Sequence, residues 1–79
     1  MIKLKPYKGE WIVYNTDNFQ LHTHVFHKRV AIKIRDCVNH RRIPDTDCRM
    51  VVESCMRLTS NKRYLRQLST RLEEISNAD

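Results

Sequence analysis

The sequence is poor in glycine, proline and cysteine. It holds one glycine, two prolines and three cysteines in 79 residues. A single glycine excludes the glycine-rich loops that cradle phosphate in nucleotide-binding proteins, because such loops need several positions without a side chain. Three cysteines are an odd number, and Cys37, Cys48 and Cys55 lack the spacing of a disulfide scaffold. We therefore expect free thiols, which are typical of a reducing cytoplasm.

Long apolar runs are also absent. The longest are about three residues, as in Trp-Ile-Val at positions 11–13, whereas a helix that spans a bilayer needs about 20 apolar residues. The first ten residues lack the apolar region of a signal peptide, which takes about 7 to 15 residues. The sequence thus predicts a protein without a membrane partner, and we expect it to stay in the cytoplasm.

Acidic residues are few compared with basic ones. Fifteen Lys and Arg against nine Asp and Glu give a formal net charge of +6. This charge favours an anionic partner, either nucleic acid or an acidic surface of another protein. With 41% hydrophobic and 8% aromatic residues, the chain has enough apolar side chains for one modest core. We expect a single basic domain over residues 1–79.

The first third of the chain has the alternation of β-strands. Apolar and polar residues alternate from residue 2, and Lys8-Gly9 and residues 15–18 (Asn-Thr-Asp-Asn) are typical of turns. In the third strand the alternation places Phe19, Leu21, Thr23 and Val25 on one face and His22 and His24 on the other. The pattern predicts a three-stranded antiparallel meander within residues 1–26.

From about residue 28 to residue 76, the apolar residues recur at helical spacing. Pro44 is expected to end the first helix, and the second is expected to run from about 46 to 58. The expected caps are Asp45 or Thr46 for the second helix and Ser60 for the third. These elements predict an α+β fold in which three helices pack on one face of the sheet.

Three histidines lie within six positions in Leu-His-Thr-His-Val-Phe-His, residues 21–27. His22 and His24 share a strand face and, with Cys37 and His40, could assemble a tetrahedral zinc site. However, the recognised spacing of zinc ligands is absent, and Cys37 falls on the apolar stripe of the first helix. We predict no metal and no cofactor, and we interpret His27 as part of the seam between strand and helix.

The same histidines could also act as acid-base catalysts. A histidine beside Lys28 and Arg29 has the chemistry for RNA cleavage, because imidazole titrates near neutral pH. No nucleophile elbow, paired-carboxylate motif or phosphate loop accompanies it. The sequence predicts a protein that is not an enzyme, with histidine-dependent RNA cleavage as the alternative.

Cationic residues gather at positions 27–29, 40–42 and 61–66. Residues 46–76 have the pattern of a helix-turn-helix, in which the second helix presents its first turns to the DNA major groove. We predict a binding protein that contacts DNA or RNA. The candidate contacts are Lys28, Arg29, Arg41, Arg42, Arg57, Lys62, Arg63 and Arg66.

The alternative function is a small adaptor or inhibitor that docks its basic face on the acidic or nucleic-acid-binding surface of a larger protein. Such a protein would depend on one or two anchors, such as an exposed Tyr7, Trp11 or Tyr64. A nucleic-acid binder would instead need its arginines and lysines almost uniformly. The oligomeric state stays open.

Overall fold

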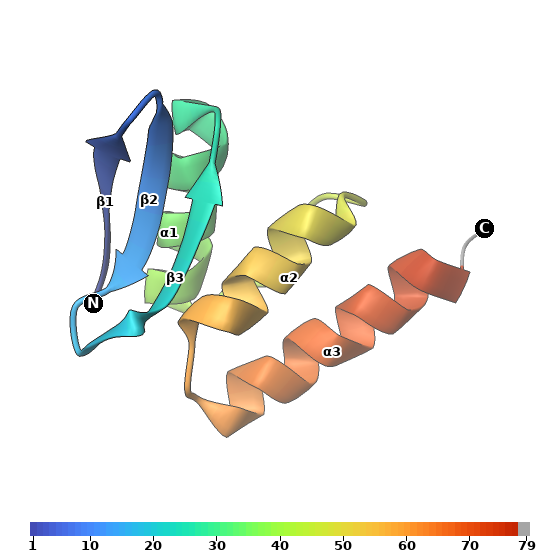
Figure 1. The fold of residues 1–79 in the computed structure, drawn as a ribbon. Coiled ribbons are helices and arrows are strands. Elements are labelled where there is room, and N and C mark those ends of the chain that lie inside the picture. The colour runs from blue at the N-terminus through green and yellow to red at the C-terminus, as the bar shows by residue number, and fades with distance from the viewer. Residues whose placement is uncertain (78–79) are drawn as a thin grey trace.

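Three strands form one antiparallel sheet, and three helices follow them in the chain (Figure 1). The computed structural model describes residues 1–77. The elements are β1 (Ile2–Tyr7), β2 (Glu10–Asn15), β3 (Asn18–Val25), α1 (Lys28–His40), α2 (Arg49–Leu58) and α3 (Lys62–Asn77). The predicted α+β class and the antiparallel meander are confirmed.

The sheet has the order β1-β2-β3. Lys8 and Gly9, between β1 and β2, both have positive φ (47° and 82°), as the two-residue turn that best matches strand twist requires. The register aligns Lys5, Ile12 and His24 in one row across the strands, and Lys3, Tyr14 and His22 in the next. These rows lie on one face of the sheet, while the alternate residues point into the core.

The core lies between the other sheet face and the helices. Val13, Ile34 and Val52 are fully buried and come from β2, α1 and α2. Helices α1 and α2 both contact the strands, and Thr23 of β3 meets Ser54 of α2 at 3.4 Å between hydroxyl oxygens. Helix α3 packs against α2 and forms the outermost layer (Figure 1). Within residues 1–77, no helix lies against the sheet face opposite α1 (Figure 1), and we call this face the open face.

Helices α2 and α3 form an antiparallel hairpin. The Arg71 guanidinium, late in α3, donates to the Asp47 carboxylate at 2.9 Å and to the Thr46 carbonyl at 3.1 Å, just before α2 begins. Near the other end of α3, the Tyr64 hydroxyl donates to the Arg42 carbonyl at 2.7 Å. These contacts hold both halves of α3 against the rest of the protein.

The end of α1 differs from the prediction. The helix stops at His40, and Arg41 takes the left-handed conformation with φ of 52°. The Arg42 N–H then donates to the Cys37 carbonyl at 2.8 Å, and the Arg41 N–H donates to the Val38 carbonyl at 3.2 Å. This is the Schellman arrangement, which satisfies the last helical carbonyls. The helix therefore ends before Pro44 can interrupt it.

Both predicted N-caps were also wrong. Cys48, rather than Asp45 or Thr46, directly precedes α2, and it makes no side-chain cap bond. The Thr46 hydroxyl accepts the Cys48 N–H at 3.2 Å in the loop before the helix. For α3 the cap is Asn61 rather than Ser60, since the Asn61 side-chain oxygen accepts the Tyr64 N–H at 2.8 Å. Within residues 1–77, no helix has the length and apolar character needed to cross a membrane.

Candidate nucleic-acid interface

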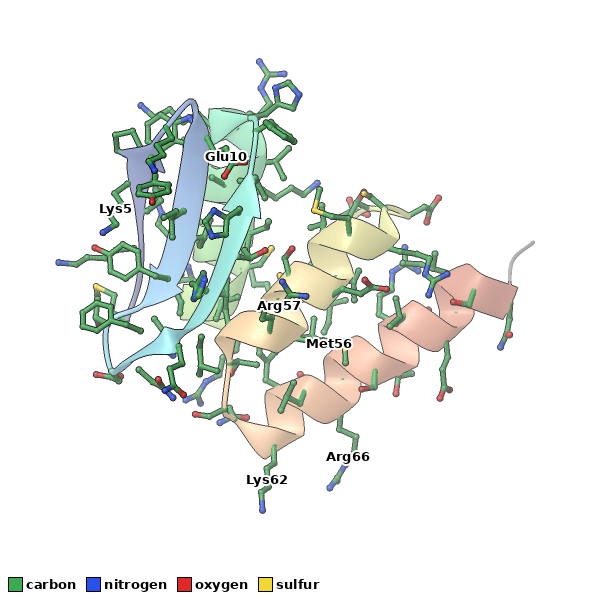
Figure 2. All side chains as sticks on the ribbon, in the orientation of Figure 1. Lys5, Glu10, Met56, Arg57, Lys62 and Arg66 are labelled. Atoms are coloured by element: carbon green, nitrogen blue, oxygen red, sulfur yellow. The ribbon has the colours of Figure 1, made fainter. Side chains whose placement is uncertain are left out.

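The end of α1 and the beginning of α3 meet at one end of the molecule. Arg41, Asn61, Arg63, Tyr64 and Gln67 line a single cleft there. Three further cations, Arg42, Lys62 and Arg66, belong to the same two segments of the chain. Arg42 succeeds Arg41 and is held by Tyr64, and Lys62 and Arg66 extend away from the body of the protein at the start of α3 (Figure 2). We call Arg41, Arg42, Lys62, Arg63 and Arg66 the basic cluster.

The basic cluster is exposed and free of ion pairs within the described residues. All five side chains are exposed, and no carboxylate of residues 1–77 lies within 4.0 Å of them. Elsewhere arginines are neutralised, as in the pairs Arg35–Asp36 at 2.9 Å and Arg49–Glu53 at 3.5 Å. The positive charge of the cluster is therefore available to an external anion.

Polar contacts within the fold position the cluster. The Asn39 side chain exchanges two hydrogen bonds with the backbone of Ile2, at 2.7 and 2.9 Å, which fix the end of α1 against β1. The Asn15 amide donates to the Leu58 carbonyl at 3.0 Å and fixes the end of α2 against β2. Because both helix ends are tied to the sheet, Arg41 and the short turn into α3 keep a fixed separation.

The charges at the start of α3 are unfavourable without a partner. The first turn of α3 carries Lys62 and Arg63 and no acidic residue. Cations at a helix N-terminus face the positive end of the helix dipole and cost about 0.3 to 1 kcal/mol each. Glu73 and Glu74 follow about 16 Å further along the helix, at 1.5 Å per residue. An anion bound near Arg63 would relieve this repulsion.

The structure leaves three predicted site residues outside the basic cluster. Lys28 and Arg29 begin α1, so the 13-residue helix separates them from Arg41 by about 20 Å. The Lys28 ammonium lies 5.0 Å from the centre of the Trp11 ring, where it covers part of the core. Arg57 is exposed on the last turn of α2, apart from Lys62 and Arg66 (Figure 2).

The α2–α3 pair does not have the crossing of a helix-turn-helix, in which the two helices meet at about 90 to 120°. The contacts between Arg71 and Asp47 require the two helices to run antiparallel, side by side. The pair is therefore an αα-hairpin. Its turn, Thr59–Asn61, presents the first residues of α3 together with Arg41 rather than as an isolated recognition helix.

The histidines are divided between two faces of the sheet. His22 and His24 are exposed on the open face, with ring centres 5.3 Å apart, and the His24 Nδ1 lies 3.0 Å from the Glu10 carboxylate. Cys37 and His40 belong to α1, on the other side. Among the residues that the structure describes, no three His, Cys, Asp or Glu side chains gather closely enough to hold a metal ion. His27 lies between β3 and α1, at the predicted seam.

The buried Cys55 thiol and the buried Tyr64 phenol stay protonated near neutral pH. Burial raises the pKa of the Cys55 thiol to about 12. Burial also raises the pKa of the Tyr64 phenol well above its usual range. Both side chains are almost fully buried, at 0% and 1% exposure. They therefore act in packing and, for Tyr64, in fixing the Arg42 backbone.

Sequence reasoning misplaced several aromatic residues. Tyr64 is buried and Trp11 is half-buried, so of the three suggested anchors only Tyr7 is exposed. Phe19 is 69% exposed and Phe26 is 74% exposed. The alternation placed Phe19 on the same face as Thr23 and Val25, which are buried, but the pairing of β2 with β3 is irregular at Tyr14 and Asn15. In β3 this irregularity falls between Asn18 and His22, which are the partners of Asn15 and Tyr14, so Phe19 lies within it. No signal in the sequence indicates it.

We compared the chain with known protein families, with curated protein sequences and with solved structures, and none of the three comparisons finds a match. The functional inference therefore depends on the geometry and charge of the chain itself.

Proposed function

We propose that this protein binds DNA or RNA without catalysing a reaction, and that the basic cluster contacts the phosphate backbone. The observation that carries the proposal is the cleft in which Arg41 of the α1 end lies beside Arg63 of α3. The cleft and the ridge of Lys62 and Arg66 beside it carry no ion pair within residues 1–77. Guanidinium groups bind phosphate oxygens in a bidentate manner, and phosphate contacts supply most non-specific affinity.

A polyanion fits this surface better than a small anion. The five cations come from two segments and extend from the cleft to the second turn of α3, so a single small ion would contact only part of them. Gln67 and Asn61 line the same cleft, and amide side chains can bind sugar or base groups. The three free cysteines are consistent with a cytoplasmic location, which we include in the proposal.

The proposal is tested with two charge-matched double variants. Arg63→Glu with Arg66→Glu reverses two charges of the basic cluster, whereas Arg29→Glu with Lys33→Glu reverses two exposed charges in the first turns of α1. Binding of a labelled 20-base-pair duplex and of a 20-nucleotide RNA is measured by gel shift at low salt. We expect the first variant to lose binding and the second to keep it. Circular dichroism checks that both remain folded.

Two results would count against the proposal. Equal weakening by the two double variants would show that net charge, rather than the cluster, attracts the nucleic acid. Absence of binding by the parent protein at low salt would remove the function itself.

An adaptor or inhibitor is the second candidate, and one observation favours it. Phe26 and Met50 are exposed, and with Val30 and His27 they line an apolar cleft between the end of β3 and the start of α2. Exposed aromatic and Met side chains are typical anchors of protein interfaces. A pull-down from lysate treated with nuclease would identify such a partner, and Phe26→Ala with Met50→Ala should release it.

A further inference from the structure

The open face of the sheet carries aromatic rings and lysines together. The Tyr14 and Phe19 rings lie 5.7 Å apart with planes inclined by 31°. They form a shallow, mostly apolar hollow with Lys5, Ile12 and His22. The Lys5 ammonium lies 5.5 Å from the centre of the Tyr14 ring, and Figure 2 shows Lys5 extending from β1 on this side. None of the three helices that the structure describes covers these side chains.

Phe19 exposes an aromatic side chain at the start of β3. Its side chain is 69% exposed, whereas Thr23 and Val25 of the same strand lie in the core. The ring stands at the rim of the hollow, with Tyr14 half-buried beside it. The Tyr14 and Phe19 rings already contact each other, so a flat ring of another molecule would stack on their exposed side, next to His22.

We propose that the open face binds single-stranded nucleic acid, with a base stacked on the exposed side of the Phe19 and Tyr14 rings at the hollow, next to His22, and with phosphates near Lys3 and Lys5. Nucleic-acid bases stack on aromatic side chains regardless of sequence, and basic residues alongside follow the backbone. In a duplex the base faces are already stacked on one another, so a flat sheet cannot reach them. The hollow therefore selects single strands.

Charge selects this occupant over a second copy of the chain. The strands hold one carboxylate, Glu10, which lies 3.0 Å from a nitrogen of the His24 ring. Lys3, Lys5 and, in the adjacent turn, Lys8 oppose it. If two such faces packed together, the lysines of one copy would lie against the lysines of the other. Like charges across an interface cost several kcal/mol. A polyanion with planar apolar rings matches both the charge and the shape.

This surface is separate from the basic cluster but lies at the same end of the molecule. Asn15, the neighbour of Tyr14 in β2, lines a cleft together with Arg41 and Asn61. A strand bound in the hollow could therefore continue past Asn15 toward the cluster. The inference goes beyond the proposed function, since either surface can bind without the other.

The test compares Phe19→Ala with Phe26→Ala, because both rings are largely exposed (69% and 74%) and only Phe19 lines the hollow. The probes are a 12-nucleotide oligothymidylate, an abasic strand of equal length and a 12-base-pair duplex. We expect Phe19→Ala to weaken oligothymidylate binding by about 5-fold or more, the loss typical of one stacked base. Binding of the abasic strand and the duplex should not change, and Phe26→Ala should leave all three affinities as they are.

The outcomes separate this inference from the proposed function. If Phe19→Ala weakens oligothymidylate binding and Arg63→Glu with Arg66→Glu weakens binding of neither the single strands nor the duplex, the open face binds and the cluster proposal is wrong. If Phe19→Ala changes none of the affinities, or weakens all three probes alike, base stacking in the hollow is refuted. A parent dimer in sedimentation that Phe19→Ala dissociates would assign the open face to a second copy instead.

Discussion

Affinity for nucleic acid should fall steeply with salt, because each phosphate neutralised by the basic cluster releases counterions. Five cations make up the cluster: Arg41, Arg42, Lys62, Arg63 and Arg66. For a duplex, five contacts at about −0.9 each give a log–log slope of about −4.5. For a single strand, about −0.7 per contact gives about −3.5. Between about 50 and 200 mM salt, these slopes correspond to losses of about 500-fold and about 130-fold.

Removing charge from the cluster should flatten this dependence. Arg63→Gln with Arg66→Gln removes two of the five cations while keeping polar side chains of similar shape. The slope should then fall in magnitude to about −2.7 for duplex and about −2.1 for single strands. Fluorescence anisotropy of a labelled oligonucleotide at four or five salt concentrations measures it. Arg29→Gln with Lys33→Gln serves as the control and should keep the slope of the parent.

Two results would refute the reasoning. A slope that the Arg63 and Arg66 substitutions leave unchanged would mean that other residues meet the phosphates. A slope close to zero in the parent would mean that the complex, if it forms, is not held by ionic contacts at all.

Four further substitutions, one of them with Ser60→Ala as its control, test the helix cap, the turn at Arg41 and the core. Asn61→Ala should lower the free energy of unfolding by about 1 kcal/mol because it removes the α3 cap, and Ser60→Ala should leave thermal unfolding unchanged. Arg41→Gly should raise that free energy by about 1 kcal/mol, since glycine adopts positive φ without strain, and should weaken nucleic-acid binding in the same titration. Leu68 is fully buried, so Leu68→Ala should cost about 2 to 5 kcal/mol in urea unfolding. Burial raises the pKa of Cys55 from 9.0 to about 12, so its contribution to stability is complete below pH 9 and is lost as pH rises toward 12. Cys55→Ala should reduce that alkaline loss in urea unfolding at several pH values.

Periodicity was enough to predict the elements because each one buries a single face. The alternation in β1 and β2 and the apolar stripe of α1 reflect packing on one side, and the structure follows them. The helix ends were not predictable in the same way. Whether Ser60 or Asn61 caps α3 depends on which side chain reaches the Tyr64 N–H, and both residue types are good caps.

Position in three dimensions decided which cations form one surface. The sequence predicted three cationic groups as candidate contacts, and the structure places Arg41 of the second in the same cleft as Arg63 of the third. The structure separates Lys28 and Arg29 from Arg41 and Arg63, because Lys28 and Arg29 begin the 13-residue helix α1 and Arg41 follows its last residue. The sequence could not reveal the aromatic hollow, since an irregular register turned Phe19 outward.

The placement of α3 connects the two proposed surfaces. A 16-residue amphipathic helix is long enough to cover a three-stranded sheet, about 24 Å at 1.5 Å per residue. Instead α3 packs on α2, where Tyr64 and Arg71 hold its two halves. The packing of α3 on α2 leaves Tyr14 and Phe19 uncovered and brings Arg63 beside Arg41. If α3 covered the open face, both the aromatic hollow and the cleft of the basic cluster would be lost. The position of α3 on α2 therefore accounts for both proposed surfaces, the one for base stacking and the one for phosphate binding.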